Sequence, residues 1–266
     1  MKQMIRIVSH NINGINAYKN NGKLDNILKL NADIYCFQEL KKADIIEVEK
    51  ILKGTSFENY IKHYELSTFK KGYAGVMTLI NPNINVINEH HPELEENIIL
   101  ENLSGYGSGR IVVSEFDNFY IINVYVINSG NKENDRIQWD KNFIEYLKTL
   151  DKPYIICGDM NVCATEKDYY GNYESAINSS PGLMDFEIND FDVLVKTLNL
   201  TDSYRYLYPN NRKYTWLSPM AKNKSNGWRL DYFLLHESLK ENIINSHIFE
   251  NWQKNDHMPI MLEINI

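Results

Sequence analysis

The sequence predicts an α/β (α+β) protein: a four-layer sandwich in which two mixed β-sheets pack face to face and helices cover their outer sides. Two observations lead to this prediction. Strand-like segments, several of them β-branched or aromatic with period-two alternation, recur along the whole chain. Helical patterns lie between the strands in both halves, so helices are available to cover each sheet. The 266 residues contain no linker-like or repeated stretch, and we expect residues 1–266 to form one domain.

The expected strands are short runs bounded by polar or turn-forming residues: Ile5–Ser9, Ile34–Phe37, Gly75–Ile80, Arg110–Phe116, Phe119–Val126, Tyr154–Cys157, Arg229–Leu235 and Pro259–Ile264. The expected helices have apolar residues at helical spacing: Lys23–Leu30, Asp44–Leu52, Asp135–Leu150 and Asp190–Leu198. Asn134 or Asp135 is predicted to cap the third helix and Asp190 the fourth, because a short polar side chain there accepts a hydrogen bond from a free amide of the first turn.

The composition excludes several classes of protein. No apolar run approaches the roughly 20 residues of a membrane-spanning helix, and the first residues lead into a strand-like segment instead of a signal peptide. The three cysteines, Cys36, Cys157 and Cys163, cannot form a disulfide framework and lack the spacing of a zinc site. We therefore expect reduced thiols in a cytoplasmic protein with no membrane partner.

The charge balance argues against a protein held to nucleic acid by overall positive charge, because 35 acidic residues outnumber 28 basic ones and leave a net charge of -7. A bound divalent metal would reverse the sign of the potential locally. Lys41–Lys42, Lys70–Lys71 and Lys222–Arg229 are either the parts of a basic rim or ordinary solvated surface.

Polar side chains gather where the predicted strands end. Six such clusters occur along the chain: Ser9–Gly14, Phe37–Lys41, Tyr125–Gly130, Cys157–Asn161, Gly227–Tyr232 and Asn255–Pro259. Each cluster alone is compatible with a turn. Because strand ends on one sheet edge converge in space, we expect the clusters together to form a functional site.

The residue types in these clusters suit metal-assisted hydrolysis of a phosphodiester. Mg²⁺ needs only one or two carboxylates besides water and substrate oxygens, and Glu39 and Asp256 are candidates. Asp159 or His257 is expected to deprotonate the attacking water, and Asp231 to fix the imidazole tautomer. Charge on the phosphoryl oxygens would be stabilised by hydrogen-bond donors, for which the candidates are Tyr125, Asn128, Asn161 and His257. Nucleophilic serine catalysis has no support, because no Gly-x-Ser-x-Gly turn is present.

The same clusters resemble the motifs of the exonuclease III-like abasic-site (AP) endonucleases, within the endonuclease/exonuclease/phosphatase superfamily. The likeness covers nearly the whole chain in the family's order: Asn11–Gly14 is similar to Trp-Asn-x-Asn/Asp-Gly, Phe37–Lys41 to Leu-Gln-Glu-Thr-Lys, Gly72–Val76 to Gly-Tyr-Ser/Ala-Gly-Val, Gly158–Val162 to Gly-Asp-Leu/Met-Asn-Val, Gly227–Phe233 to Gly-Trp-Arg-Leu-Asp-Tyr-Phe and Asp256–Ile260 to Asp-His-x-Pro-Ile. Tyr214–Trp216 and Gly227–Tyr232 point to the DNA-repair branch.

The resemblance implies roles for the matching residues. The implied metal is Mg²⁺, for which Mn²⁺ is expected to substitute. Its implied ligands are Asn11, Glu39, Asp159, Asn161, Asp256 and His257. The catalytic group is Tyr125, Asp159, Asn161, Asp231 and His257. Substrate contacts are implied for Asn13, Lys41, Tyr73, Asn128, Trp216, Trp228 and Leu230, the last three as walls of a pocket for a base-free sugar. Whether Asp159 or His257 is the base, and whether one or two metals act, stays open.

The chain departs from the family pattern at several positions outside the catalytic group. His10 replaces an aromatic residue, Asn16 a DNA-contacting arginine, Leu40 a threonine, and Ile127 the proline that makes the turn before Asn128 rigid. The loop of residues 164–184 lacks the family's landmarks.

The function implied is Mg²⁺-dependent cleavage of double-stranded DNA on the 5′ side of abasic sites, by a monomer, with 3′–5′ exonuclease or 3′-phosphodiesterase activity on damaged 3′ ends. One alternative is a superfamily phosphodiesterase or phosphatase acting on a lipid or inositol phosphate, which the acidic net charge favours. Another is a catalytically silent DNA-binding protein, which predicts the loss of at least one catalytic residue. All six residues that would decide this are present: Glu39, Asp159, Asn161, Asp231, Asp256 and His257.

Overall fold

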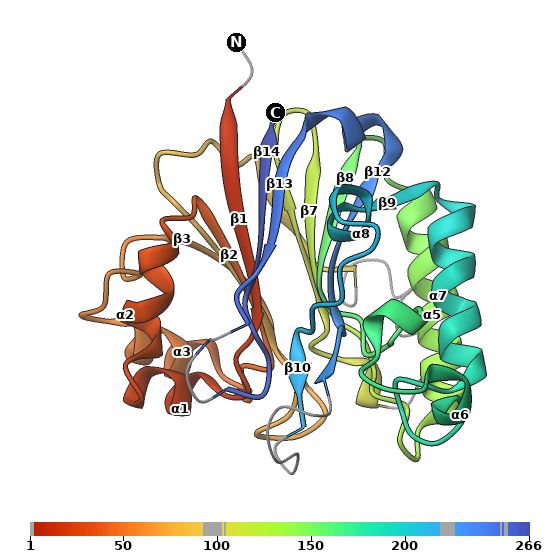
Figure 1. The fold of residues 1–266 in the computed structure, drawn as a ribbon. Helices are drawn as coiled ribbons and strands as arrows, with labels where there is room; N and C mark the ends of the chain where they lie inside the picture. The colour runs from red at the N-terminus through yellow and green to blue at the C-terminus, as the bar shows by residue number, and fades with distance from the viewer. Residues whose placement is uncertain (1–2, 93–102, 104, 219–226, 251, 253–254) are drawn as a thin grey trace.

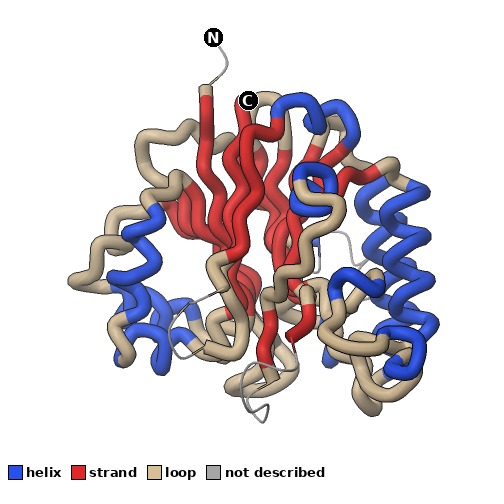
Figure 2. The backbone as a smooth tube through the Cα atoms, in the orientation of Figure 1, coloured by secondary structure: helices blue, strands red, loops and turns tan. Residues whose placement is uncertain are grey.

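A computed structural model describes residues 3–92, 103, 105–218, 227–250, 252 and 255–266. Within these residues, the strands form two six-stranded mixed sheets and a short two-stranded ribbon. The two large sheets face each other, and helices lie on both outer sides (Figure 1). Figure 2 shows the strands gathered in the centre between the two groups of helices. The predicted four-layer sandwich is confirmed.

The first sheet is built around two parallel strands, β1 (Met4–Asn11) and β2 (Ile34–Gln38). The antiparallel strands β14 (Ile260–Asn265) and β4 (Val76–Ile80) flank them. The edges of the sheet are formed by β13 (Ile243–Ile248) and β3 (Ile61–Glu65).

The second sheet repeats this plan around the parallel strands β7 (Tyr120–Tyr125) and β8 (Tyr154–Asp159), with β5 and β9 at its edges. Its other strands are β5 (Asn88–His90), β6 (Ile111–Glu115), β9 (Leu200–Asp202) and β12 (Asp231–His236). The ribbon pairs β10 (Trp216–Leu217) with β11 (Gly227–Trp228).

The helices cover opposite outer faces. The first sheet carries α1 (Ile15–Asn20), α2 (Lys23–Ile27), η1 (Leu28–Leu30) and α3 (Ile45–Leu52), and the second carries α5 (Glu133–Lys148) and α7 (Asp185–Thr197) (Figure 1). Single-turn elements complete the connections: η2 (Gly105–Gly107), η3 (Glu166–Asp168), α6 (Tyr173–Ala176), α8 (Ser203–Leu207) and η5 (Glu237–Asn242). No helix in the described ranges is both long enough and apolar enough to span a bilayer.

The predicted caps of the last two long helices are wrong. Helix α5 begins at Glu133, after Lys132, without a side-chain cap, so Asn134 and Asp135 lie inside its first turn. Helix α7 begins five residues earlier than expected, which places Asp190 in its interior. Instead, Glu187 in its first turn accepts hydrogen bonds through Oε2 from the amides of Gly182 and Met184, which precede the helix.

Apolar side chains fill the space between the sheets, and they include Ile7, Cys36, Ile121 and Ile155. Cys36, Cys157 and Cys163 are buried free thiols, as predicted. A polar pair interrupts this layer: Gln38 Nε2 donates to Asn123 Oδ1 at 2.7 Å and to Ser9 Oγ at 3.0 Å. The Asn123 amide donates in turn to the carbonyl of Met77 at 2.9 Å. The two sheets are therefore joined by hydrogen bonds between buried polar groups, and a second buried contact links them where His63 Nδ1 lies 2.8 Å from Ser114 Oγ.

Candidate active site

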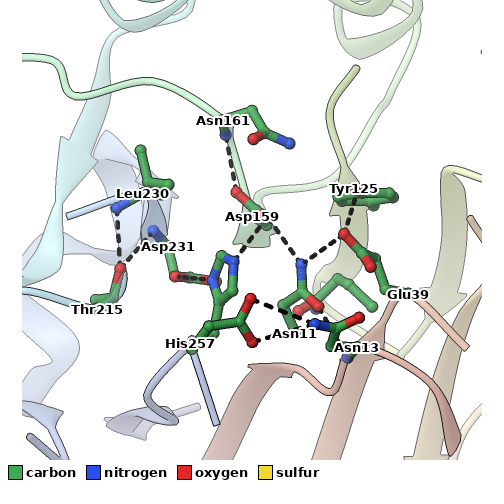
Figure 3. A network of polar contacts seen from close by, with 12 residues as sticks. Asn11, Asn13, Glu39, Tyr125, Asp159, Asn161, Thr215, Leu230, Asp231 and His257 are labelled. Atoms are coloured by element: carbon green, nitrogen blue, oxygen red, sulfur yellow. Dashed lines mark hydrogen bonds and ion pairs between the residues drawn. The ribbon is translucent and has the colours of Figure 1, made fainter. Parts of the chain in front are cut away.

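The polar clusters found in the sequence meet at one edge of the sandwich. The parallel strands β1, β2, β7 and β8 all end there, and β12 and β14 run antiparallel to their neighbours, so their first residues lie at the same edge. Asp231, the first residue of β12, is the direct cross-strand partner of Asp159, the last residue of β8. Figure 3 shows that side chains from both sheets point into a shared space.

His257 lies between two carboxylates. Its Nδ1 is 2.9 Å from Asp231 Oδ2, and its Nε2 is 3.7 Å from Asp159 Oδ2 (Figure 3). Burial alone would lower the pKa of His257, but the charges of Asp231 and Asp159 outweigh it and raise the pKa to about 10. The imidazole is therefore held as a cation at neutral pH, with Asp231 fixing its orientation.

Asp159 accepts hydrogen bonds from two further groups. Asn11 Nδ2 donates to Oδ2 at 2.9 Å, and the Asn161 amide donates to Oδ1 at 2.9 Å. Burial and the nearby Asp231 raise the pKa of Asp159 to about 7, against the opposing charge of His257. The preceding Gly158 has a φ of 141°, and a Cβ there would lie 1.9 Å from the carbonyl oxygen of Val124. Only glycine lets the chain bring Asp159 into this position.

Glu39 follows β2 with a φ of 55° and lies half-buried in the site. Its Oε2 is 3.0 Å from Lys41 Nζ, and its Oε1 accepts a hydrogen bond from the Tyr125 hydroxyl. Burial would raise the pKa of Glu39, but Lys41 and Tyr125 lower it below the ordinary value. Burial and Glu39 raise the pKa of Tyr125 well above its usual range, so Tyr125 remains a neutral hydrogen-bond donor.

Asp256 lies next to the amide of Asn13, whose Nδ2 is 3.3 Å from both carboxylate oxygens. Lys41 Nζ donates to Asn13 Oδ1, so Asn13 joins the Asp256 and Glu39 sides of the site. The backbone amide of Asn13 also donates to Asn11 Oδ1 at 3.1 Å. All these groups belong to the predicted metal-ligand or substrate-contact sets.

The set of donors fits a hard divalent cation. One ligand atom from each of Asp159, Asp231 and His257 lies within 4.8 Å of the others, but the cationic His257 already lies between these two carboxylates. Together with Glu39 and Asp256, the site holds four carboxyl groups. An excess of carboxylate oxygens over cationic side chains suits Mg²⁺ or Mn²⁺, whereas thiolates suited to softer metals do not take part in the site's contacts.

Asn128 and Asn161 lie together at the ends of β7 and β8. Asn161 has a φ of 47°, its Nδ2 donates to the carbonyl of Val126 at 2.9 Å, and its Oδ1 accepts from Asn128 Nδ2 at 3.2 Å. The predicted contribution of Asn128 to the site thus has a structural basis although Ile127 replaces the family's proline.

Tyr73 reaches the site through Arg110, which the sequence analysis placed in a strand but did not select. Arg110 is 1% exposed and donates to the backbone carbonyl of Tyr125 at 3.0 Å and to the Tyr73 hydroxyl. Lys70 and Lys132 lie over the Tyr73 ring, with Nζ 5.0 and 5.6 Å from its centroid. These cations form a positive surface beside an otherwise acidic site. The signal available was a basic residue at the start of an apolar strand.

Trp216, Trp228 and Leu230 form an aromatic and aliphatic cluster beside His257. Trp216 and Trp228 are register partners in the ribbon, and their ring centroids are 5.3 Å apart. Trp228 and Leu230 are 9% and 6% exposed, whereas Trp216 is half-buried and forms an isolated β-bridge with His257. The Thr215 hydroxyl, which the sequence analysis missed, accepts from the amides of Leu230 and Asp231 at 2.9 and 3.0 Å.

Arg229 belongs neither to a basic rim nor to solvated surface, the two alternatives left open by the sequence. Its side chain is buried and donates to Asp168 and Asp202 at 2.6 Å each, while Arg205 also donates to Asp168 at 2.6 Å. This ion-pair network anchors the loop of residues 164–184 beneath the aromatic cluster. Residues 222–226 lie outside the described residues. Lys42 and Lys71 both pair with one carboxylate, that of Glu47.

His10, the departure at the end of β1, supports the site from below. Its Nδ1 is 3.0 Å from the Tyr18 hydroxyl, and its Nε2 is 3.1 Å from the carbonyl oxygen of His257 and 2.8 Å from Asn255 Nδ2. Burial lowers the pKa of His10 to about 3, so the ring is neutral. His10 and Asn255 lie in two of the predicted polar clusters but were given no role there, and only the fold brings them together.

Known proteins are similar to this chain in fold and in sequence. The AP endonuclease LMAP from Leishmania major has a similar structure, with a TM-score of 0.84 at 23% identity over 99% of this chain and 88% of that one. The exodeoxyribonuclease of Bacillus subtilis is 32% identical over 98% of this chain and its own full length. The DNA repair nuclease APEX1 of Danio rerio is 33% identical over 97% of this chain and 81% of its own. Residues 8–244 match the Endonuclease/Exonuclease/phosphatase family, and the chain belongs to that family.

Proposed function

We propose that this protein is a DNA repair phosphodiesterase that cleaves the backbone on the 5′ side of abasic sites and removes blocking groups from damaged 3′ ends. One observation carries the proposal: the carboxylate-flanked His257 is the backbone β-bridge partner of Trp216, a half-buried member of the aromatic cluster. The groups suited to phosphodiester hydrolysis therefore lie beside an apolar surface that suits a base-free sugar. The names of the relatives, exodeoxyribonuclease and DNA repair nuclease, support a DNA substrate. We expect a monomer acting in the cytoplasm.

Asp159 is proposed as the base that accepts a proton from the attacking water. Both ring nitrogens of His257 face carboxylates, so the imidazole is a cation without a free lone pair. A cationic His257 is suited to stabilise charge on a phosphoryl oxygen. Asp159, held by Asn11 and Asn161, keeps its carboxylate aimed at the space between them. Tyr125 and Asn161 offer further donors to the phosphate.

Glu39, Asp256 and Asn11 would hold the metal, because hydrogen bonds of Asn11 and Asn13 link these three oxygen-bearing side chains to one another. Mg²⁺ bound by these residues would supply positive charge that offsets the negative charge of the phosphate.

The direct test is a duplex that carries a single tetrahydrofuran abasic analogue, incubated with the protein and either Mg²⁺ or EDTA. We expect one nick, 5′ to the analogue, only with Mg²⁺, and removal of a 3′-phosphate from a nicked duplex. An intact duplex of the same sequence and an inositol phosphate serve as controls. Hydrolysis of the inositol phosphate without nicking would contradict the proposal, and so would DNA binding without cleavage.

Glu39→Gln is expected to raise the Mg²⁺ concentration for half-maximal cleavage by about tenfold or more, the scale of a change at a metal site. The glutamine keeps an acceptor for Tyr125 but removes the charge that attracts the cation. A Mg²⁺ titration of the single-turnover rate measures the effect. Glu47→Gln, which changes a carboxylate paired with Lys42 outside the site, is the matched control. An unchanged Mg²⁺ requirement would remove Glu39 from the metal site.

Trp216→Ala is expected to reduce discrimination between abasic and intact duplex by roughly 1–3 kcal/mol, the scale of a lost aromatic contact to nucleic acid. Trp216 is chosen because it is half-buried, whereas Trp228 is buried against Gly182 and its truncation would also destabilise the fold. Competition binding in EDTA measures the effect without cleavage. Tyr206→Ala, at an exposed tyrosine on α8, is the control. Equal discrimination in a folded Trp216→Ala protein would place the sugar contact elsewhere.

A further inference from the structure

Arg136 of α5 is a buried cation directly behind the site. It is 2% exposed, and its guanidinium reaches three backbone carbonyls: Nη1 donates to Ile127 at 2.8 Å and to Asn161 at 3.2 Å, and Nη2 donates to Met160 at 3.2 Å. Its Nε donates to Asp140 at 2.6 Å on the same helix. A planar guanidinium presents its donors in a fixed fork, so these bonds constrain the relative positions of the carbonyls.

The three carbonyls belong to the two turns that present Asn128 and Asn161. Ile127 precedes Asn128 directly and occupies the position where the resembling family has a proline, whose ring would fix φ. Asn161 has a φ of 47°, a left-handed conformation that asparagine adopts more readily than other non-glycine residues. Arg136 supplies contacts to both turns at once, and the Asn128–Asn161 side-chain hydrogen bond of 3.2 Å lies on the other side of the same two turns.

The same arginine is linked to the loop beneath the aromatic cluster. Glu187 Oε1 is 3.5 Å from Arg136 Nη1, and Glu187 Oε2 accepts from the amide of Gly182 at 2.6 Å. The carbonyl of Gly182 accepts from the amide of Cys163 at 2.7 Å. Gly182 packs so closely on Trp228 that a Cβ there would lie 3.1 Å from the indole ring. The buried Arg136–Glu187 ion pair therefore links the turns that carry Asn128 and Asn161 to the aromatic cluster.

We propose that Arg136 is a positioning residue that sets Asn128 and Asn161 for the reaction and, in this chain, replaces the rigidity of the missing proline at position 127. The proposal rests on the proposed function, because its rate measurement needs the abasic substrate. Arg136 touches neither the reacting atoms nor the predicted metal ligands' side chains, and it acts through backbone carbonyls.

Arg136→Lys is the informative variant. Lysine keeps the buried charge near Asp140 and Glu187, but its single ammonium cannot span the three carbonyls. We expect the single-turnover rate on the abasic duplex to fall by about 10²-fold, the scale of a displacement of about 1 Å in a reacting group's surroundings. Affinity for the uncleaved duplex in EDTA should change by less than about threefold.

Ile127→Pro provides the rescue. Within the described residues the Ile127 amide donates to no partner, so proline removes no hydrogen bond there and restrains the turn directly. Ile127→Pro alone should leave the rate near wild type. Combined with Arg136→Lys, it should restore the rate by about tenfold over the single lysine variant. Asp140→Asn, which removes a partner of Arg136 but none of the carbonyl bonds, is the matched control and should stay within about twofold of wild type.

The side-chain amide resonances of Asn128 and Asn161 give a second measurement that needs no activity. Arg136→Lys should shift both, and Ile127→Pro should return them toward their wild-type positions. An Arg136→Lys protein that keeps the wild-type rate and resonances overturns the proposal. So does one that fails to melt cooperatively, or one whose rate Ile127→Pro does not improve, because Arg136 then only stabilises the fold. If the wild-type protein cleaves no abasic duplex, the proposed function fails, and the amide resonances still decide the role of Arg136.

Discussion

Asp159→Asn and His257→Ala are each expected to lower the single-turnover rate on an abasic duplex by at least roughly 10²-fold, the low end for the loss of a base or of a charge-stabilising group. The asparagine of the first variant could still accept the hydrogen bond from Asn11, but its neutral amide cannot accept a proton from water. Removing the imidazole in the second variant would leave Asp159 and Asp231 facing each other without the intervening cation. Rapid-quench measurement of the nicked strand at saturating protein gives the rate.

Binding of the uncleaved duplex should fall much less in both variants, because the cations around Tyr73 and the aromatic cluster are untouched. Two variants of the same residue types, far from the site, serve as controls: Asp192→Asn, at an exposed pair on α7, and His236→Ala, at the far end of β12. A near-wild-type rate for either site variant would contradict the assignment of that residue.

Asp168→Ala is expected to lower the free energy of unfolding by about 3–5 kcal/mol, the range for removing one partner of a buried ion pair. Asp168 is fully buried and accepts from both Arg229 and Arg205 at 2.6 Å, and its loss leaves Arg229 with Asp202 alone. Burial would raise the pKa of Asp168, but Arg229 lowers it below the ordinary value. Its stabilisation is therefore fully present above the ordinary carboxyl pKa and is lost as the pH falls through the lowered one. Urea unfolding measures the change.

The matched control is Glu166→Gln, two residues away. Glu166 pairs with Arg212 on the surface, with side chains 66% and 43% exposed, and such pairs contribute about 0–1 kcal/mol. If Asp168→Ala were no more destabilising than Glu166→Gln, the network around Arg229 would not be what holds the loop of residues 164–184.

The apolar patterns of the sequence predict the interior strands of both sheets and none of the edge strands. The eight predicted strands are the eight interior ones, where residues such as Ile7 and Ile156 are shielded on both faces and produce a strong apolar pattern. The four edge strands β3, β5, β9 and β13 were not predicted. They carry polar residues such as Lys62 and Asn245 and pair on one side only, so their conformation depends on the neighbour and not on local pattern.

In the candidate site too, the sequence predicts some residues and not others. Residues that carry chemistry, such as Asp159 and His257, stand in motifs and could be selected from the sequence. Residues that hold them in place could not, because Arg110, Thr215 and Arg136 act through backbone atoms that are distant in the sequence. Their partners exist only once the sheets have paired, and no spacing rule encodes a contact between a side chain and a remote carbonyl.

The hydrogen bond between Gln38 and Asn123 influences how the two sheets are placed relative to each other. Apolar sheet faces attract each other without directional preference, so several offsets between them would bury comparable area. The buried hydrogen bond between these two amides forms in one offset only, and any other offset would leave both groups without it. Gln38 directly precedes Glu39, and Asn123 lies two residues before Tyr125, so the offset it selects is also the one in which the Tyr125 hydroxyl meets Glu39. We infer that this pair adds little net stability and instead sets the relative placement of the two halves of the active site.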